Sequence, residues 1–104
     1  MSLHIEGRRW FQRTYGNTYH TVTVYANGAQ VFKSPKAYGY GDQWIQTALD
    51  WLRADGSDYL QWDQAYELLA RYPSGNYMHT GTIALREILG ASYSCIDVPR
   101  EKDL

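Results

Sequence analysis

The dipeptide Asn27-Gly28 constrains the fold of this chain more than any other feature of its sequence. It lies between two runs of alternating apolar and polar residues. This pattern is typical of a β-hairpin closed by a type I′ turn, whose two central residues both need positive φ. Gly16-Asn17 offers a second tight turn upstream. We therefore predict a three-stranded antiparallel meander with strands over 9–15, 19–26 and 29–34.

The two faces of the predicted meander differ in composition. Counting outward from the turns pairs Phe11 with Val22 and Val24 with Val31, so these four residues share the face that packs on the core. The opposite face would carry aromatic residues among several threonines: Trp10, Tyr19, Tyr25 and Phe32. Aromatic and threonine side chains are favourable cross-strand neighbours, so this face is explained either by sheet stability or by binding.

Beyond residue 41 the hydrophobic period changes from two to about 3.6, which predicts helices. The first apolar stripe starts near Asp42 and stops at Gly56, and its members are Trp44, Ile45, Ala48, Leu49 and Leu52. A second helix is predicted over 58–72, and a short third one over 82–89 with Gly90 as its stop.

Residues 91–98 alternate again and predict a fourth strand. The expected fold is therefore α+β: a small antiparallel sheet, made of the N-terminal meander plus this C-terminal strand, with two to three helices packed on one face.

The 104 residues fit a single domain, 1–104. The string Ile5-Glu6-Gly7-Arg8 coincides with a protease recognition sequence, so residues 1–8 are expected to be flexible and without functional weight. The charged residues 99–104 are expected to be flexible as well. No apolar run approaches the roughly 18–20 residues that span a bilayer, which predicts no membrane segment. A single cysteine, Cys95, fits a reducing cytoplasm.

The formal net charge is −1, which argues against a dedicated nucleic-acid binder with a strongly basic body. The charges are unevenly spread, because residues 1–36 hold five basic residues against one acidic, and residues 37–70 hold six acidic residues against one basic. This asymmetry indicates either two faces of opposite sign or simply a solvated surface.

No motif in the sequence carries recognisable chemistry. The three histidines, His4, His20 and His79, do not lie at metal-ligand spacing from one another or from Cys95, so no metal site is predicted. Cys95 lacks the strand–turn–helix context of a catalytic nucleophile. The loop at 38–44 matches neither common phosphate-binding pattern. We therefore expect no enzyme activity, no catalytic residues and no cofactor.

Ten tyrosines and four tryptophans are the strongest functional signal. The candidate partner-binding residues are Trp10, Tyr19, Tyr25, Phe32, Tyr38 and Tyr40, and the candidate basic rim consists of Arg8, Arg9, Lys33 and Lys36. Aromatic residues beside arginine are typical of protein–protein interfaces. The same residues would suit stacking of single-stranded DNA or RNA, and an exposed aromatic face also fits a homodimer. The remaining interpretation is that another element of the chain covers this face of the sheet.

Two strings at the ends of the chain resemble a group of short proteins encoded by tailed bacteriophages and prophages. They are Arg9–Val22, which reads RWFQRTYGNTYHTV, and Asp97–Leu104, which reads DVPREKDL; the YGYGD run at 38–42 belongs with them. Residues 58–90 show no such likeness. No activity is known for this group that could be assigned to the chain. The resemblance implies only its origin, as an accessory protein of a mobile element in the cytoplasm of a bacterial host.

Small phage accessory proteins commonly act by occupying a surface of a host protein, and anti-CRISPR proteins are one such class. The resemblance therefore implies a non-enzymatic protein that binds a host protein or protein–nucleic-acid complex. We expect it to inhibit a defence or nucleic-acid-processing complex by steric occlusion. A single-strand nucleic-acid-binding module is the alternative.

Overall fold

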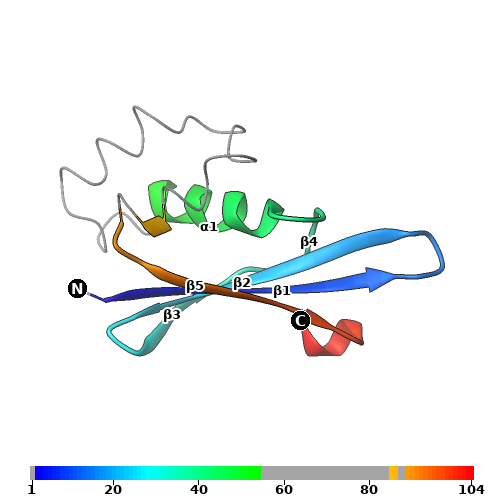
Figure 1. Ribbon diagram of the computed structural model, residues 1–104, viewed down its shortest axis with the longest axis horizontal. Helices are drawn as coiled ribbons and strands as arrows, with labels where there is room; N and C mark the ends of the chain where they lie inside the picture. Colours follow the sequence, from blue (N-terminus) through cyan, green and yellow to red (C-terminus); the bar gives the residue numbers. More distant parts are fainter. Residues whose placement is uncertain (1, 55–84, 87–88) are drawn as a thin grey trace.

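The computed structural model of this chain describes residues 2–54, 85–86 and 89–104. Within them the chain forms a five-stranded sheet, one α-helix and a short 3-10 helix, which confirms the α+β class. The elements are β1 (Leu3–Gln12), β2 (Asn17–Ala26), β3 (Ala29–Lys33), β4 (Ala37–Tyr38), α1 (Gln43–Ala54), β5 (Ser92–Val98) and η3 (Glu101–Asp103). In Figure 1, α1 lies along one face of the sheet and the C-terminal turn lies on the opposite side.

The hairpin at Asn27-Gly28 forms as predicted. Both residues have positive φ, 53° for Asn27 and 84° for Gly28, and Ala26 pairs with Ala29 across the turn. Asparagine and glycine tolerate this backbone region better than other residues, which is why this dipeptide closes the hairpin.

The connection between β1 and β2 differs from the predicted two-residue turn. Residues 13–16 form a four-residue loop, closed by the Gly16 amide donating to the carbonyl oxygen of Gln12 at 2.9 Å. Phe11 consequently pairs with Thr18, and Val22 pairs with Gly7. The pairing has moved by four residues, and an even displacement keeps every side chain on its predicted face.

This displacement brings the first residues of the chain into the sheet. Leu3 to Arg8, expected to be flexible, form the first half of β1 and pair with both β2 and β5. Leu3 and Ile5 are buried in the core. The Ile5-Glu6-Gly7-Arg8 string is therefore part of the folded sheet.

The pairing of β2 with β3 contains a bulge that the sequence did not predict. Ala26 pairs with Ala29, but Val24 pairs with Phe32 instead of Val31, because the register shifts between Val24 and Tyr25. A shift by one residue reverses the face of the strand residues beyond it. The prediction that Phe32 lies on the outer face is therefore wrong: Phe32 lies on the α1 side and stacks on Trp51 of α1 at 4.4 Å between ring centroids.

The sheet is mixed, whereas an entirely antiparallel sheet was predicted. The strand order is β3-β2-β1-β5, with β4 paired to β2, and β5 runs parallel to β1. Residues 91–98 do return to the sheet as expected. The predicted antiparallel direction of this strand is wrong. Because β5 is parallel to β1, the chain must cross over the sheet before β5 pairs.

The α1 helix begins and ends close to its predicted bounds, and its apolar stripe forms the centre of the core. All five stripe residues are buried: Trp44, Ile45, Ala48, Leu49 and Leu52. They pack on the inner face of the sheet with Leu3, Ile5, Val22 and Val24. Phe11 lies on this same face but is 55% exposed, because its pairing places it near the β1–β2 loop, and the hairpin extends past α1 in Figure 1.

The helix predicted over 58–72 lies outside the described residues, and so does most of the one predicted over 82–89. Leu85 and Leu89 are buried in the same core as α1. Gly90 has φ of 62°, the left-handed conformation expected where a helix stops. No helix within the described ranges is long and apolar enough to cross a membrane.

The C-terminal residues, expected to be flexible, make polar contacts with the sheet. Arg8 Nη1 donates to the main-chain oxygen of Asp103 at 2.9 Å, and Lys33 Nζ donates to that of Leu104 at 3.2 Å. An ion pair at 3.4 Å joins Lys36 to Glu101. These contacts hold η3 against the outer face, where Thr21 and Thr23 are buried.

Candidate interaction surface

Three aromatic side chains from three neighbouring strands form a ladder on the outer face of the sheet. Trp10 of β1 pairs with Tyr19 of β2, and Tyr19 pairs with Tyr38 of β4. The ring centroids are 5.9 Å apart in the first pair and 5.8 Å apart in the second. Lys36 Nζ lies 4.9 Å from the centroid of the Tyr19 ring. Cross-strand aromatic pairs of this kind fix ring orientation as well as adding stability.

The ladder belongs to a larger group of aromatic side chains at the end of the β1–β2 hairpin. Phe11, Tyr15, Tyr38 and Tyr40 are each more than half exposed. Ile96 on β5 is the remaining large apolar side chain with high exposure among the described residues. We define the hairpin-end surface as Trp10, Tyr15, Tyr19, Tyr38 and Tyr40; Phe11 lies at the same end of the hairpin but on the inner face of the sheet.

The loop that carries Tyr38 and Tyr40 is tied to the body of the protein through Gly39. The Gly39 amide donates to the Thr18 carbonyl oxygen at 3.0 Å. His20 Nδ1 lies 3.2 Å from the Gly39 carbonyl oxygen, and His20 Nε2 lies 2.7 Å from the Thr47 hydroxyl on α1. With a carbonyl oxygen as its acceptor, Nδ1 must carry the proton. His20 therefore links strand, loop and helix.

The environment of His20 favours the neutral imidazole. Its side chain is buried, and burial lowers its pKa, while the hydrogen bond to Gly39 acts in the opposite direction and only partly offsets this effect. A neutral ring with the proton on Nδ1 can accept the Thr47 hydroxyl proton on Nε2. Near neutral pH the loop is thus held without a buried charge.

Two of the predicted partner-binding residues lie away from the hairpin end. Tyr25 is on the outer face but sits at the far end of β2 beside His4, at 6.1 Å between ring centroids. Phe32 is on the inner face, stacked on Trp51. The structure therefore brings together Trp10, Tyr19 and Tyr38, leaves Tyr40 exposed in the loop that follows, and separates Tyr25 and Phe32 from the ladder.

The four predicted rim residues all have acceptors within the protein. Arg8 Nε lies 2.8 Å from Glu6 Oε1, in addition to its contact with Asp103. Lys33 and Lys36 bind the C-terminal segment. Arg9 lies on the opposite face, because neighbouring residues of a strand point to opposite sides.

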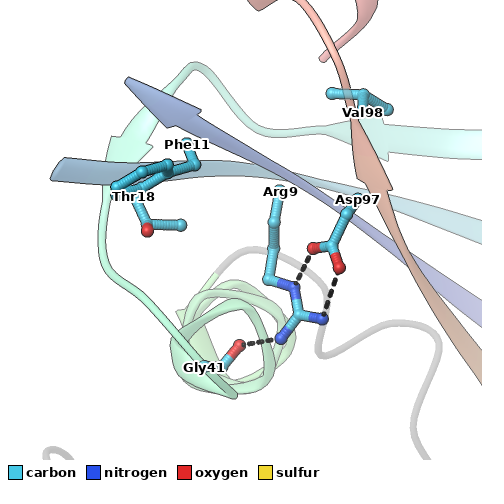
Figure 2. Close-up of a pocket in the computed structure, with 6 residues that line it drawn as sticks. All are labelled: Arg9, Phe11, Thr18, Gly41, Asp97 and Val98. Atoms are coloured by element: carbon cyan, nitrogen blue, oxygen red, sulfur yellow. Dashed lines mark hydrogen bonds and ion pairs between the residues drawn. The ribbon is translucent and has the colours of Figure 1, made fainter. Parts of the chain in front are cut away.

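Arg9 forms one wall of a pocket of about 300 Å³ that the sequence did not indicate. Its lining residues are Arg9, Phe11, Thr18, Gly41, Asp97 and Val98 (Figure 2). Arg9 Nε donates to Asp97 Oδ1 at 2.8 Å, and Arg9 Nη1 donates to the Gly41 carbonyl oxygen at 3.0 Å. Arg9 and Asp97 are 88 residues apart in sequence and meet because β5 pairs with β1. No local sequence signal could have joined them.

Cys95 lies close to this pocket but is poorly suited to nucleophilic chemistry. Burial is the main cause that raises the pKa of its thiol, and the positive charge of Arg9 lowers it by less. A raised pKa leaves the thiol protonated near neutral pH, whereas the thiolate is the reactive form. Within the described ranges, no group of three or more His, Cys, Asp or Glu side chains is placed to hold a metal ion.

Comparison with known proteins adds no functional assignment. No protein-family model matches this chain, and neither a curated protein nor a solved structure shows significant similarity to it.

Proposed function

We propose that this protein binds a host protein through its hairpin-end surface and acts by blocking access to that partner. The observation that carries the proposal is the Trp10–Tyr19–Tyr38 ladder on the outer face, together with the exposed rings of Tyr15 in the β1–β2 loop and Tyr40 two residues after Tyr38. Exposed apolar groups that cluster together are typical of interaction sites, and tyrosine and tryptophan dominate the energetics of such sites.

The surface is also pre-ordered, which favours tight binding. Trp10, Tyr19 and Tyr38 hold one another across three strands, and His20 anchors the adjoining loop. A surface that is rigid before binding loses less conformational entropy when the partner docks.

The charges at this end favour a protein over a nucleic acid as partner. A phosphate backbone requires cationic side chains free to replace its counterions. Here Arg8, Lys36 and Arg9 are already engaged by Glu6, Glu101 and Asp97. A phosphate contact at these three residues would have to compete with those acceptors.

The resemblance of the chain ends to phage and prophage proteins directs the proposal to a bacterial host. The partner would be a component of a defence complex, such as a CRISPR effector, or of a nucleic-acid-processing complex in the host cytoplasm. Occlusion alone would suffice as the mode of inhibition, and the proposal assigns no catalytic step to this chain.

The test is affinity capture with tagged protein from a nuclease-treated bacterial lysate that contains defence systems, with captured proteins identified by mass spectrometry. A stoichiometric protein partner should be recovered with wild-type protein and lost with Tyr38→Ala, whose melting temperature should stay close to wild type. Tyr25→Ala, at the far end of the outer face, is the matched control and should retain the partner. Equal capture by both variants would refute the assignment of the surface.

A single-strand nucleic-acid module is the second candidate, supported by the stacked Trp10–Tyr19 pair with Lys36 beside it. Aromatic rings on a sheet can stack bases in this way. Recovery of nucleic acid alone from an untreated lysate, lost on nuclease treatment, would favour this function. Sedimentation analysis of the purified protein tests the remaining use of the surface, a homodimer.

A further inference from the structure

The pocket beside Arg9 has the chemistry of a site for a cation. Arg9 already directs its guanidinium at Asp97 and the Gly41 carbonyl, so its positive charge is largely satisfied within the protein. We propose that the pocket receives the guanidinium or ammonium group of an arginine or lysine side chain. The inference rests on the proposed function in one respect, since that side chain would belong to the bound partner.

Asp97 provides the charge for this role. Its side chain is 76% exposed, whereas that of Arg9 is 27% exposed, so the carboxylate presents its outer side to the solvent although Arg9 binds it from within. A carboxylate offers about four acceptor positions and can accept from two guanidinium groups at once. Asp97 therefore has capacity left for a second cation.

The other groups around the pocket also favour a cation over an anion. The Gly41 carbonyl oxygen and the Thr18 hydroxyl are acceptors. Asp42, next to Gly41, adds a second negative charge, and its field reaches Cys95 together with those of Arg9 and Asp97. The lining itself holds one positive and one negative charge, so Asp42, beside it in the chain, tips the local balance toward negative.

Phe11 completes the site with an aromatic surface. It is 55% exposed and, in Figure 2, lies with Thr18 on one side of Arg9, while Asp97 lies on the other side. A guanidinium group that binds a carboxylate at its edge can also lie against an aromatic ring. Phe11 lies at the same end of the hairpin as the Trp10–Tyr19–Tyr38 ladder but on the inner face, so the pocket opens on the other side of the sheet.

The direct test is a titration of ¹⁵N-labelled protein with N-acetyl-arginine amide, followed by amide chemical shifts. We expect saturable shifts at Thr18, Gly41 and Asp97. The citrulline analogue has the same shape without the charge and should cause none. Shifts of equal size with both compounds would overturn the proposal.

Two variants with a matched control sharpen this test. Asp97→Asn removes the charge at an exposed position and should abolish the arginine-dependent shifts, and Phe11→Leu should weaken them while preserving apolar volume. Asp103→Asn, on the opposite face, should respond as wild type does. Unchanged binding by Asp97→Asn, in protein whose spectrum shows it folded, would also overturn the proposal.

The titration does not depend on the partner, so it separates this inference from the proposed function. Failure to capture any partner would contradict the proposed function and leave the arginine titration to decide the pocket. Once a partner is known, Asp97→Asn should weaken its binding about ten-fold, as expected for the loss of a charge-assisted hydrogen bond. If Asp97→Asn binds the partner with full affinity while Tyr38→Ala loses partner binding, the partner does not use the pocket and this part of the proposal is refuted.

Discussion

Gly7 is a residue at which β1 and α1 approach closely. A Cβ atom placed on it would lie 2.6 Å from Cδ2 of the buried Trp44 ring. Glycine ordinarily weakens a strand, so its presence in the middle of β1 needs a reason. The reason here is the flat contact between the Trp44 ring and the strand backbone.

Gly7→Ala should therefore destabilise the protein, by about 1–3 kcal/mol as is usual for overpacked cores. Urea unfolding would measure this loss. Trp44→Leu removes the ring, and we expect Gly7→Ala to cost much less in that background. A neutral or stabilising effect of Gly7→Ala would contradict the close contact between Gly7 and the Trp44 ring.

His20 connects stability to pH. Burial lowers its pKa in the folded state below the ordinary value of about 6.5, so the unfolded chain binds the proton more tightly. The stabilising effect is therefore complete above about pH 6.5 and is lost as the pH falls through the lowered pKa of the folded state.

We expect the free energy of unfolding to fall between pH 7.5 and pH 5, and His20→Gln to flatten this dependence. His4→Gln should retain the slope that His20 causes. NMR titration of the His20 ring gives an independent measurement, and a midpoint at or above 6.5 would contradict the burial of a neutral ring.

At the level of elements, two register differences had opposite consequences. The β1–β2 pairing is displaced by four residues from the one predicted, and Phe11, Val22 and Val24 still lie on the predicted face. The bulge between β2 and β3 moves the pairing by one residue, and Phe32 changes face. The side-chain period of a strand is two, so only the odd displacement alters which residues form the core.

Phe32 should consequently behave as a core residue. Phe32→Ala removes the stacking on Trp51, and we expect a loss of roughly 1–3 kcal/mol. Tyr40→Ala, at a side chain that is 63% exposed, is the control and should change stability by no more than about 0.5 kcal/mol. Thermal unfolding of both variants decides the point, and equal melting temperatures would place Phe32 outside the core.

At the scale of the whole molecule, the two faces of the sheet are covered unequally. The α1 helix packs on the inner face and the C-terminal segment is held on the outer face by Arg8, Lys33 and Lys36, while the hairpin extends past α1 (Figure 1). Aromatic residues at the hairpin end therefore remain accessible. The four predicted rim residues, Arg8, Arg9, Lys33 and Lys36, instead bind groups of this same chain.

This arrangement predicts weak salt dependence of partner binding. Affinity for the captured protein should change less than about ten-fold between 50 and 200 mM salt, whereas a protein with 6–10 phosphate contacts would lose about 10³–10⁵. Calorimetric titration at the two salt concentrations makes the comparison. A steep loss of affinity would move the function to nucleic-acid binding.

Local signals in the sequence determined the α+β class, the Asn27-Gly28 hairpin, the buried stripe of α1 and the aromatic residues on the outer face near Tyr19. Each depends on residues close together in the chain, whose periodicity and turn chemistry act over a few positions. Tertiary structure alone decided the parallel pairing of β5, the bulge that turns Phe32 inward, the place of residues 3–8 in the sheet and the meeting of Arg9 with Asp97. These depend on where distant segments return, and that is determined by the packing of Trp44 on Gly7 and of Phe32 on Trp51, which no short window of sequence contains.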